Sequence, residues 1–434
     1  VQPAAWLPDF VADVRVVSVS AVDLDGDGLP EIVTSGFGHV EYFPNLGGLQ
    51  WGAAVSLHQD PTPGKVWTTV VFGDLDGDGR LDLFLPTQQL AQDPQPNASH
   101  PLLLQREDGV FQHVTDLVVG TEGSDSIASA LSDFDRDGDL DVILLKDQGD
   151  RSGLFRNDGL GPDGVPRFTD VAVELGFTFG WNAMGMDSID LNDDGVLDWC
   201  VSDNGPPRCM LSVGDGYVEA AASLGLSPAR PVGSLGSLGW SIDFADLDND
   251  GWVEMIQASG IAHDETDNFP DLLFRGLPDG RFEDVSDAWG VNSEDDHYAS
   301  VTADFDGDGF LDVLMTGPGL VPELHRSRCG GESWIDLDLA GPRGNGEGYG
   351  AVVELLSATR TQTRELHSQR SQGQTPSRLH FGLGGESEPV SLRIAWPDGL
   401  EQEVDGLEVN RRYQLRHPGT WAALVPGVEP VVPE

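Results

Sequence analysis

The sequence predicts an all-β fold: a six-bladed β-propeller with calcium-binding loops, followed by a small C-terminal β-domain. Seven blades are the alternative. An acidic nine-residue motif occurs six times, and its first aspartates stand at positions 23, 74, 133, 190, 246 and 304. Runs with β-strand character flank every copy. Intervals of 51 to 59 residues filled with strands and turns are typical of propeller blades.

The repeated motif has the chemistry of a calcium loop. In Asp74-Leu-Asp76-Gly-Asp78-Gly-Arg-Leu-Asp82, carboxylates stand at positions 1, 3, 5 and 9, and position 7 offers a backbone carbonyl. Calcium takes roughly six to eight oxygen ligands, and the glycine found at position 6 of every copy permits a sharp turn. An EF-hand would need a glutamate at position 12 and flanking helices, which the motif lacks. Acidic turns that merely solvate a hairpin are the alternative, but clustered like charges repel one another without a cation.

We therefore expect up to six Ca²⁺ ions, one for each blade. The fourth site is expected to be the weakest, because Asn192 replaces a carboxylate. The expected ligands are positions 1, 3, 5, 7 and 9 of each motif: Asp23, Asp25, Asp27, Leu29 and Glu31; Asp74, Asp76, Asp78, Arg80 and Asp82; Asp133, Asp135, Asp137, Asp139 and Asp141; Asp190, Asn192, Asp194, Val196 and Asp198; Asp246, Asp248, Asp250, Trp252 and Glu254; Asp304, Asp306, Asp308, Phe310 and Asp312.

The propeller is expected to occupy residues 1–332. After each motif comes a strand, a variable loop and a two-strand unit with a glycine turn, which gives four strands for each repeat. Only about twenty residues follow the sixth motif before the composition changes near Cys329. Residues 10–14 read like the fourth-strand segments of other repeats, so we expect the first strand to close the ring by completing the last blade.

A second all-β domain is expected over residues 333–417. This segment has no carboxylate loops, and its strand-like runs are separated by turn chemistry such as Pro397-Asp-Gly399. The tail, residues 418–434, is rich in proline and is expected to be an irregular strap or a disordered end.

Charge and composition limit the partners. The formal net charge is −49, and six calcium ions would reduce it to about −37, so nucleic acid and anionic membranes are excluded as partners. No run of 18 apolar residues is present, which argues against membrane insertion. We expect a monomer that binds a protein or a glycan. Weak calcium loops are useful only where calcium is plentiful, so we expect a secreted protein, extracellular or periplasmic, whose signal has been removed before Val1.

The three cysteines cannot all pair. Cys200 and Cys209 flank a turn-rich segment between two strand-like runs, so a disulfide across a hairpin is expected in an oxidising compartment, with Cys329 free. Two buried free thiols are the alternative.

Two sets of residues carry a family resemblance. The repeats resemble the FG-GAP/VCBS family of calcium-binding propeller repeats. The segment with Leu379-His-Phe-Gly-Leu-Gly384 and Trp396-Pro-Asp-Gly399 resembles the ASPIC/UnbV domain. It departs from that pattern at Gly348-Tyr-Gly-Ala351 and Gly373-Gln374. The order of domains is similar to the cartilage acidic protein family and its bacterial relatives. The resemblance implies fold, calcium and export, and it implies no substrate.

The sequence favours a binding or scaffold module over an enzyme. It contains no His-Glu-x-x-His, Gly-x-Ser-x-Gly or phosphate-binding loop. Gly159-Leu-Gly161-Pro-Asp-Gly164 matches a dinucleotide fingerprint, but its proline and the lack of a following helix make it a turn. We name no catalytic residue. A calcium-dependent hydrolase or lyase with its site at the propeller mouth is the main alternative, and a lectin is another.

The ligand surface is expected on the face opposite the calcium loops, because those loops are committed to holding ions. Long loops on a rigid scaffold commonly carry binding function, and exposed Trp and Tyr are favoured at recognition sites. The alternative is that the aromatic residues only plug the channel. The candidates are Trp67, Ser126, Trp181, Asn182, Trp240, His263, Asp264, His297 and Tyr298.

Overall fold

A computed structural model describes most of the chain. The described residues are 16–60, 62–89, 99–117, 126–146, 151–178, 183–203, 205–227, 238–260, 270–293, 295–327, 330–369, 374, 376–419 and 429–431. Among them, the only helix is the single turn α1 (Ser286–Trp289), and no helix is long and apolar enough to cross a membrane. The prediction of an all-β propeller fold with an added β-domain is confirmed.

Six antiparallel sheets carry the six motifs. Their strands are β1 (Val16–Val22), β2 (Glu31–Gly36), β3 (His39–Phe43) and β4 (Val55–Gln59); β6 (Val71–Gly73), β7 (Asp82–Phe84), β9 (His100–Gln105) and β10 (Phe111–Leu117); β11 (Ser126–Ser132), β12 (Asp141–Lys146), β13 (Gly153–Leu160) and β14 (Pro166–Asp170); β15 (Met186–Ile189), β16 (Asp198–Val201), β17 (Arg208–Val213) and β18 (Gly216–Glu219); β19 (Leu238–Ala245), β20 (Glu254–Gly260), β21 (Leu272–Gly276) and β22 (Phe282–Asp284); β23 (Ala299–Ala303), β24 (Asp312–Thr316) and β25 (Glu323–His325).

Every motif has the same place in its sheet. The first strand of each sheet ends one residue before a motif, and the second strand begins at the last residue of that motif. The motifs are therefore the loops between the first and second strands, as the sequence predicts. The last sheet has three described strands, and the strand expected to complete it, residues 10–14, lies outside the described residues.

Two four-stranded sheets form the C-terminal domain. One has the order β29-β26-β32-β33 and the other β28-β27-β30-β31. Their bounds are β26 (Ser333–Ala340), β27 (Val352–Leu356), β28 (Thr361–Glu365), β29 (Arg378–Gly384), β30 (Val390–Ala395), β31 (Glu401–Leu407), β32 (Arg411–Arg416) and β33 (Glu429–Val431). The last of these strands lies in the proline-rich tail and pairs in parallel with β32, so this part of the tail is not irregular.

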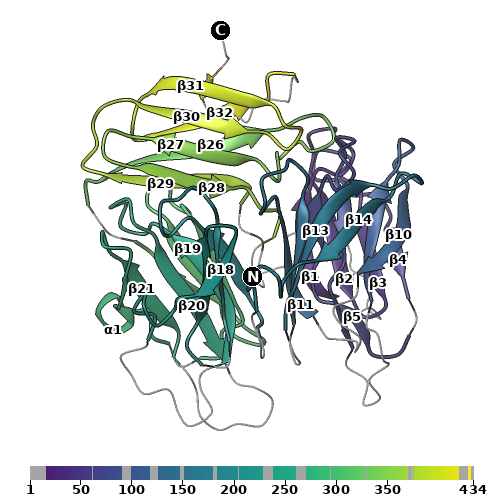
Figure 1. The fold of residues 1–434 in the computed structure, drawn as a ribbon, viewed down its shortest axis with the longest axis horizontal. Helices are drawn as coiled ribbons and strands as arrows, with labels where there is room; N and C mark the ends of the chain where they lie inside the picture. The colour runs from purple at the N-terminus through teal and green to yellow at the C-terminus, as the bar shows by residue number, and fades with distance from the viewer. Residues whose placement is uncertain are drawn as a thin grey trace.

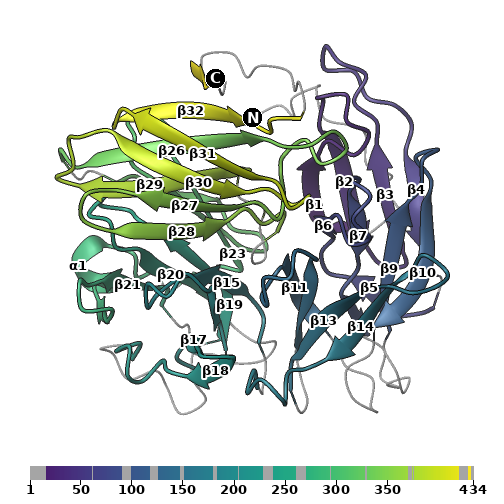
Figure 2. The same cartoon turned by 45° about the horizontal axis from the view of Figure 1, so that its top comes forward.

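The C-terminal domain shares a hydrophobic core with the first two sheets of the propeller. One cluster joins Val33 and Phe72 of the propeller to Ile335 and Phe381 of the domain, and all four side chains are at most 1% exposed. The domain's strands lie over one end of the propeller sheets in both views (Figures 1 and 2). Burial of this much apolar surface favours one fixed arrangement of the two domains.

A small additional sheet buries Trp67, so the expectation that this residue is a ligand contact is wrong. Strands β5 (Lys65–Trp67) and β8 (Thr87–Gln89) pair with each other beside the second sheet. Trp67 is 0% exposed there, and its ring packs edge-on against His58 with centroids 4.9 Å apart. Ser126 is also fully buried. Neither side chain can serve as an exposed ligand contact in this conformation, and Trp67 belongs to a buried hydrophobic cluster.

A disulfide joins neighbouring strands of the fourth sheet. Cys200 of β16 and Cys209 of β17 are directly opposite each other in the strand register, and their sulfur atoms are bonded. The predicted pairing therefore holds in this structure. Cys329, expected to be a free thiol, lies outside the described residues.

Candidate metal centre: six acidic loops beneath the C-terminal domain

The six loops share one hydrogen-bonded conformation. The first carboxylate of each motif accepts the N–H of the position-6 glycine, at 2.7 to 3.0 Å. The last carboxylate accepts the N–H of position 2, at 2.7 to 3.2 Å. Two carboxylates, at the two ends of the motif, thereby fold the loop upon itself.

Backbone conformation explains the residues at two loop positions. The position-6 glycines all have φ between 80° and 98°, a left-handed region that favours glycine. Position 4 is also left-handed in all six loops, and there the sequence has glycine three times and otherwise Arg136, Asp193 and Asn249, with φ of 57° to 61°. Asn and Asp tolerate this region better than most residues, so two of these three exceptions are ordinary.

The acidic side chains converge as a cation site requires. In five loops, three carboxylates present oxygens within 4.8 Å of one another: Asp23, Asp25 and Asp27; Asp74, Asp76 and Asp78; Asp133, Asp135 and Asp141; Asp246, Asp248 and Asp250; Asp304, Asp306 and Asp308. The fourth loop has no such carboxylate triplet because Asn192 occupies position 3. There the Asn192 amide donates to Asp194, 3.1 Å away, and to the Ser212 carbonyl, 3.0 Å away.

Burial makes these carboxylates costly as free anions. Desolvation raises the pKa of Asp74 and Asp133 to about 6, of Glu31 and Asp198 to about 7, and of Asp141 to about 9. Neighbouring carboxylates in the same loop add to the shift in each case, and for Asp198 that neighbour is Asp190. A divalent cation would reverse this balance, because its charge favours the ionised form.

Several carboxylate oxygens have no partner among the described residues. Asp76 Oδ1, Asp246 Oδ1 and Glu254 Oε1 are buried without a hydrogen bond. A buried unpaired oxygen costs free energy, and a hard cation bound in each of the second and fifth loops would satisfy these oxygens. The donor set therefore fits calcium. Bound calcium would supply positive charge that neutralises the loops, and the chain's own contribution is to hold the oxygens in place.

Opposite pH dependences are expected with and without calcium. The metal-free fold binds protons on Asp74, Asp133 and Glu31 more tightly than the unfolded chain, whose pKa values are near 3.8 and 4.5. The stability from this source is complete below about pH 4 and is lost as the pH rises through about 6 to 7. Calcium competes with the same protons, so its affinity should rise over that window. Between pH 5 and 8 the melting temperature should therefore fall with rising pH in chelator and rise with pH in limiting calcium. A melting temperature that changes in the same direction under both conditions would contradict this.

The C-terminal domain contacts all six loops. The Glu347 carboxylate accepts the Asp23 N–H at 2.8 Å, and the Gly344 carbonyl accepts the Leu81 N–H at 3.1 Å. Ser132, next to the third loop, donates to Glu365 at 2.6 Å, and Gly350 lies against Leu140 within that loop. The remaining contacts are Arg360 to Asp193 in the fourth loop, at 2.7 Å, His380 to Asn249 in the fifth, at 2.7 Å, and Trp334 against Gly309 in the sixth. All six loops therefore lie on the face that this domain covers.

Three described residues that follow β28, namely His367, Ser368 and Gln374, contact the first strands of four sheets. Ser368 Oγ accepts the Phe72 N–H at 2.9 Å, and Gln374 exchanges hydrogen bonds with the backbone of Ala21. The His367 ring lies 2.9 Å from Ser188 Oγ and 3.2 Å from the Leu131 carbonyl. These three residues thus contact β1, β6, β11 and β15.

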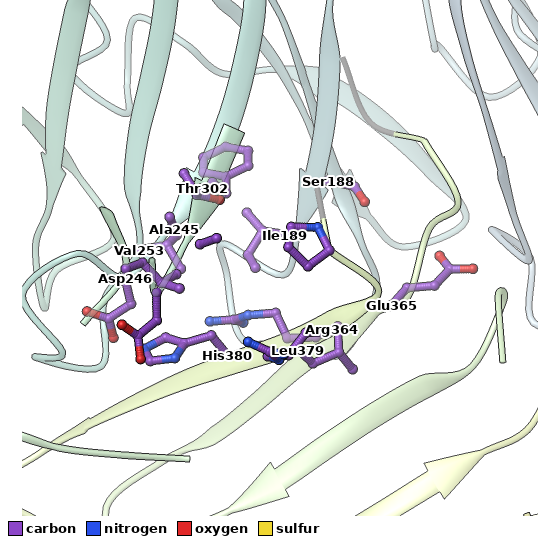
Figure 3. Close-up of a pocket in the computed structure, with 16 residues that line it drawn as sticks. Ser188, Ile189, Ala245, Asp246, Val253, Thr302, Arg364, Glu365, Leu379 and His380 are labelled. Atoms are coloured by element: carbon purple, nitrogen blue, oxygen red, sulfur yellow. The ribbon is translucent and has the colours of Figure 1, made fainter. Parts of the chain in front are cut away.

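Arg360 and His380 join the domain to the fourth and fifth loops. Arg360 lies 3.7 Å from the centroid of the Trp252 ring in the fifth loop and pairs with Asp193 in the fourth. The ring nitrogens of His380 lie 2.7 Å from Asp336 in its own domain and 2.7 Å from Asn249 in the propeller. Figure 3 shows His380 beside Asp246, at the pocket between the domains. The sequence placed His380 in the domain motif but gave no sign of its propeller partner.

The face opposite the loops keeps two of the predicted aromatic residues together. The rings of Trp240 and Tyr298 stack with centroids 4.1 Å apart and planes 13° apart, and both side chains are half-buried. His297, next to Tyr298, is fully buried, and its Nδ1 lies 2.7 Å from Asp271, which raises the pKa of the ring. Its Nε2 has no hydrogen-bond partner. Trp181, Asn182, His263 and Asp264 lie outside the described residues.

Comparisons with known proteins agree with this architecture. The family model for an FG-GAP-like repeat matches residues 13–85, 133–201 and 190–256, and the model for ASPIC and UnbV matches residues 341–421. Cartilage acidic protein 1 of Mus musculus is 24% identical over 447 residues, and that of Homo sapiens is 24% identical over 446 residues. These alignments cover 93% of this chain, which spans 65% of the mouse protein and 63% of the human one.

Two solved structures are similar to this chain at low identity. The Dos1 propeller is 8% identical, with a TM-score of 0.42 over 73% of this chain and 69% of that one. An Agrocybe aegerita lectin that recognises non-reducing terminal N-acetylglucosamine is 20% identical, with a TM-score of 0.38 over 64% of this chain and 66% of that one. Likenesses this distant carry no argument about ligands. With its repeats, its last domain and its relatives in agreement, the chain is an FG-GAP-repeat β-propeller with a C-terminal ASPIC/UnbV domain, similar to the cartilage acidic protein family.

Proposed function

We propose that this protein is an exported binding or scaffold module that calcium stabilises and that recognises a protein or a glycan. The observation that carries the proposal is the contact of the C-terminal domain with all six acidic loops. Ions bound there would sit beneath a domain that shares its core with the propeller, which suits a structural role. The opposite face then remains for a ligand.

The half-buried pair Trp240 and Tyr298 supports this choice of face. Flat aromatic surfaces bind sugars and proteins with little loss of side-chain entropy, and Trp and Tyr are enriched among the residues that dominate binding. Gly260 lies against both rings, so that a Cβ there would stand 3.1 Å from each. A larger residue at that position would press on the stacked pair. The expectation that Trp67 also belongs to this surface is withdrawn, because that side chain is fully buried.

The test begins with a search for the ligand. Purified protein is applied to glycan and secreted-protein arrays with millimolar calcium and with chelator, and any hit is measured with the double variant Trp240→Ala, Tyr298→Ala. We expect about thirtyfold weaker binding or more, because a single residue of this kind commonly contributes ~2 kcal/mol and the two contributions are not additive. Trp289→Ala is the matched control, since Trp289 is 37% exposed on the short helix. Undiminished binding by the double variant, with a normal melting curve, would place the ligand elsewhere.

A calcium-dependent hydrolase or lyase is the second candidate, and one geometry favours it. Asp271 holds the Nδ1 side of the His297 ring, which leaves Nε2 as a buried nitrogen without a partner near the Trp240 and Tyr298 pair. A histidine oriented by a carboxylate is a common general base. Product analysis of each glycan hit decides between the two: turnover that His297→Gln abolishes favours the enzyme, and binding without turnover favours the module.

A further inference from the structure

A cleft of about 500 Å³ opens between the propeller and the C-terminal domain, beside the third and fourth loops. Its propeller wall is formed by residues 136–138 and 195–197, and its other wall by residues of β27 and β28 and by residues 395–401. The volume falls within the range of about 300 to 1,000 Å³ that is usual for ligand pockets. This cleft is separate from the face proposed above for the ligand, and the inference does not depend on that proposal.

Glu365 gives the cleft a buried hydrogen-bond acceptor. Its side chain is 1% exposed, and it lines the cleft from the end of β28. One carboxylate oxygen, Oε2, accepts the Ser132 hydroxyl at 2.6 Å, while the other, Oε1, has no hydrogen-bond partner. Figure 3 shows the carboxylate directed away from Asp246 and His380, which line the neighbouring pocket. Glu365 Oε1 is therefore a buried acceptor to which no group among the described residues donates a hydrogen bond, and leaving it so costs free energy.

The charges around Glu365 favour a cation as that donor. Glu354 and Glu401 also line the cleft, together with Asp133 and Asp137 of the third loop, and the one cationic side chain among the lining residues is Arg136. Calcium in the third loop would neutralise the two aspartates, but it would leave the carboxyl groups of Glu354, Glu365 and Glu401, with Arg136 as the one cationic side chain among the lining residues. Apolar atoms of Val196, Val352 and Pro397 complete the walls, as the methylene stem of a basic side chain requires.

We propose that this cleft receives a lysine or arginine side chain from a partner protein, with Glu365 Oε1 as its acceptor and the Glu354 and Glu401 carboxylates at the rim. Charge complementarity also favours a basic partner for the chain as a whole, whose formal charge is −49. The alternative occupant of the cleft is a ligand with a carboxylate group that completes the coordination of calcium in the third loop. It would meet the carboxyl groups of Glu354, Glu365 and Glu401 in the cleft, so we favour the basic side chain.

Two glutamates near each other allow a matched test that separates binding in the cleft from non-specific electrostatic attraction. Glu354 and Glu403 both lie beside Arg393, at 3.9 and 3.4 Å, but only Glu354 lines the cleft. A fluorescent peptide with three arginines in a neutral sequence is titrated at physiological salt and millimolar calcium. We expect Glu354→Arg to weaken binding by on the order of tenfold and Glu403→Arg by about twofold or less, since exposed pairs contribute little.

Glu365 is tested with the isosteric variant Glu365→Gln, which keeps an acceptor for Ser132. We expect on the order of thirtyfold weaker binding, because the buried carboxyl group that would pair with the basic side chain is removed. If melting shows that this variant is unfolded, the Glu354 and Glu403 pair decides alone. Equal weakening by Glu354→Arg and Glu403→Arg would overturn the proposal, since it would mean only non-specific attraction. Calcium-dependent binding of an acidic control peptide in place of the basic one would overturn it as well.

Discussion

Removing calcium with excess chelator is expected to lower the melting temperature of the purified protein by ~10 °C or more. At a free calcium concentration about 100 times the dissociation constant, each bound ion contributes about 2.7 kcal/mol by mass action. Six such contributions will not add fully, and for a chain of 434 residues each kcal/mol shifts the melting temperature by only ~1 to 2 °C. The physical reason is the set of buried carboxylates, several of which have oxygens without any partner among the described residues.

Adding calcium back should restore the original curve, and magnesium at the same concentration should not, because it needs a smaller octahedral site and keeps its water molecules. The fourth loop should release its ion first, since Asn192 leaves it without the carboxylate triplet of the other five. An identical melting curve in chelator and in calcium would refute the assignment of calcium to the loops and with it the calcium part of the proposed function.

The repeated elements could be predicted because the information is local. A carboxylate at position 1 and a glycine at position 6 meet within one loop, as Asp23 and Gly28 do at 2.9 Å, so the motif alone determines the turn. The strand before and the strand after follow from the same spacing. The disulfide was predictable for a similar reason, since Cys200 and Cys209 are only nine residues apart on paired strands.

The docking of the C-terminal domain could not be predicted, because its contacts join residues far apart in the sequence. Glu347 meets Asp23 across 324 positions, and Ser368 meets Phe72 across 296. No periodicity relates these pairs. The burial of Trp67 was missed for a related reason: its position before the second motif predicted a place at the channel mouth, but the pairing of β5 with β8 buries its side chain.

The substitution Gly382→Ala is expected to disrupt the contact between the C-terminal domain and the fifth loop. A Cβ at Gly382 would lie 2.0 Å from Asp246 Oδ2 and 2.6 Å from the Asn249 Cα. The strand cannot easily move away, because Gly382 pairs with Trp334 in β26 and its carbonyl accepts the Gln362 amide at 2.8 Å. Overpacking of this kind commonly costs about 1 to 3 kcal/mol, and displacement of Asp246 would also remove the first ligand of the fifth site.

Two measurements on Gly382→Ala test this expectation together: the melting temperature in calcium, which should fall, and the number of calcium ions bound, which should decrease by one. Gly385→Ala is the control, since that glycine lies three residues further along the same domain with open space around its Cβ position. The neighbouring bonds from the Gly384 N–H to the Asn249 carbonyl, 2.7 Å, and from His380 to the Asn249 side chain, 2.7 Å, should weaken with the displaced loop. Full calcium stoichiometry and an unchanged melting temperature for Gly382→Ala would mean that the fifth loop and the domain motif do not support each other.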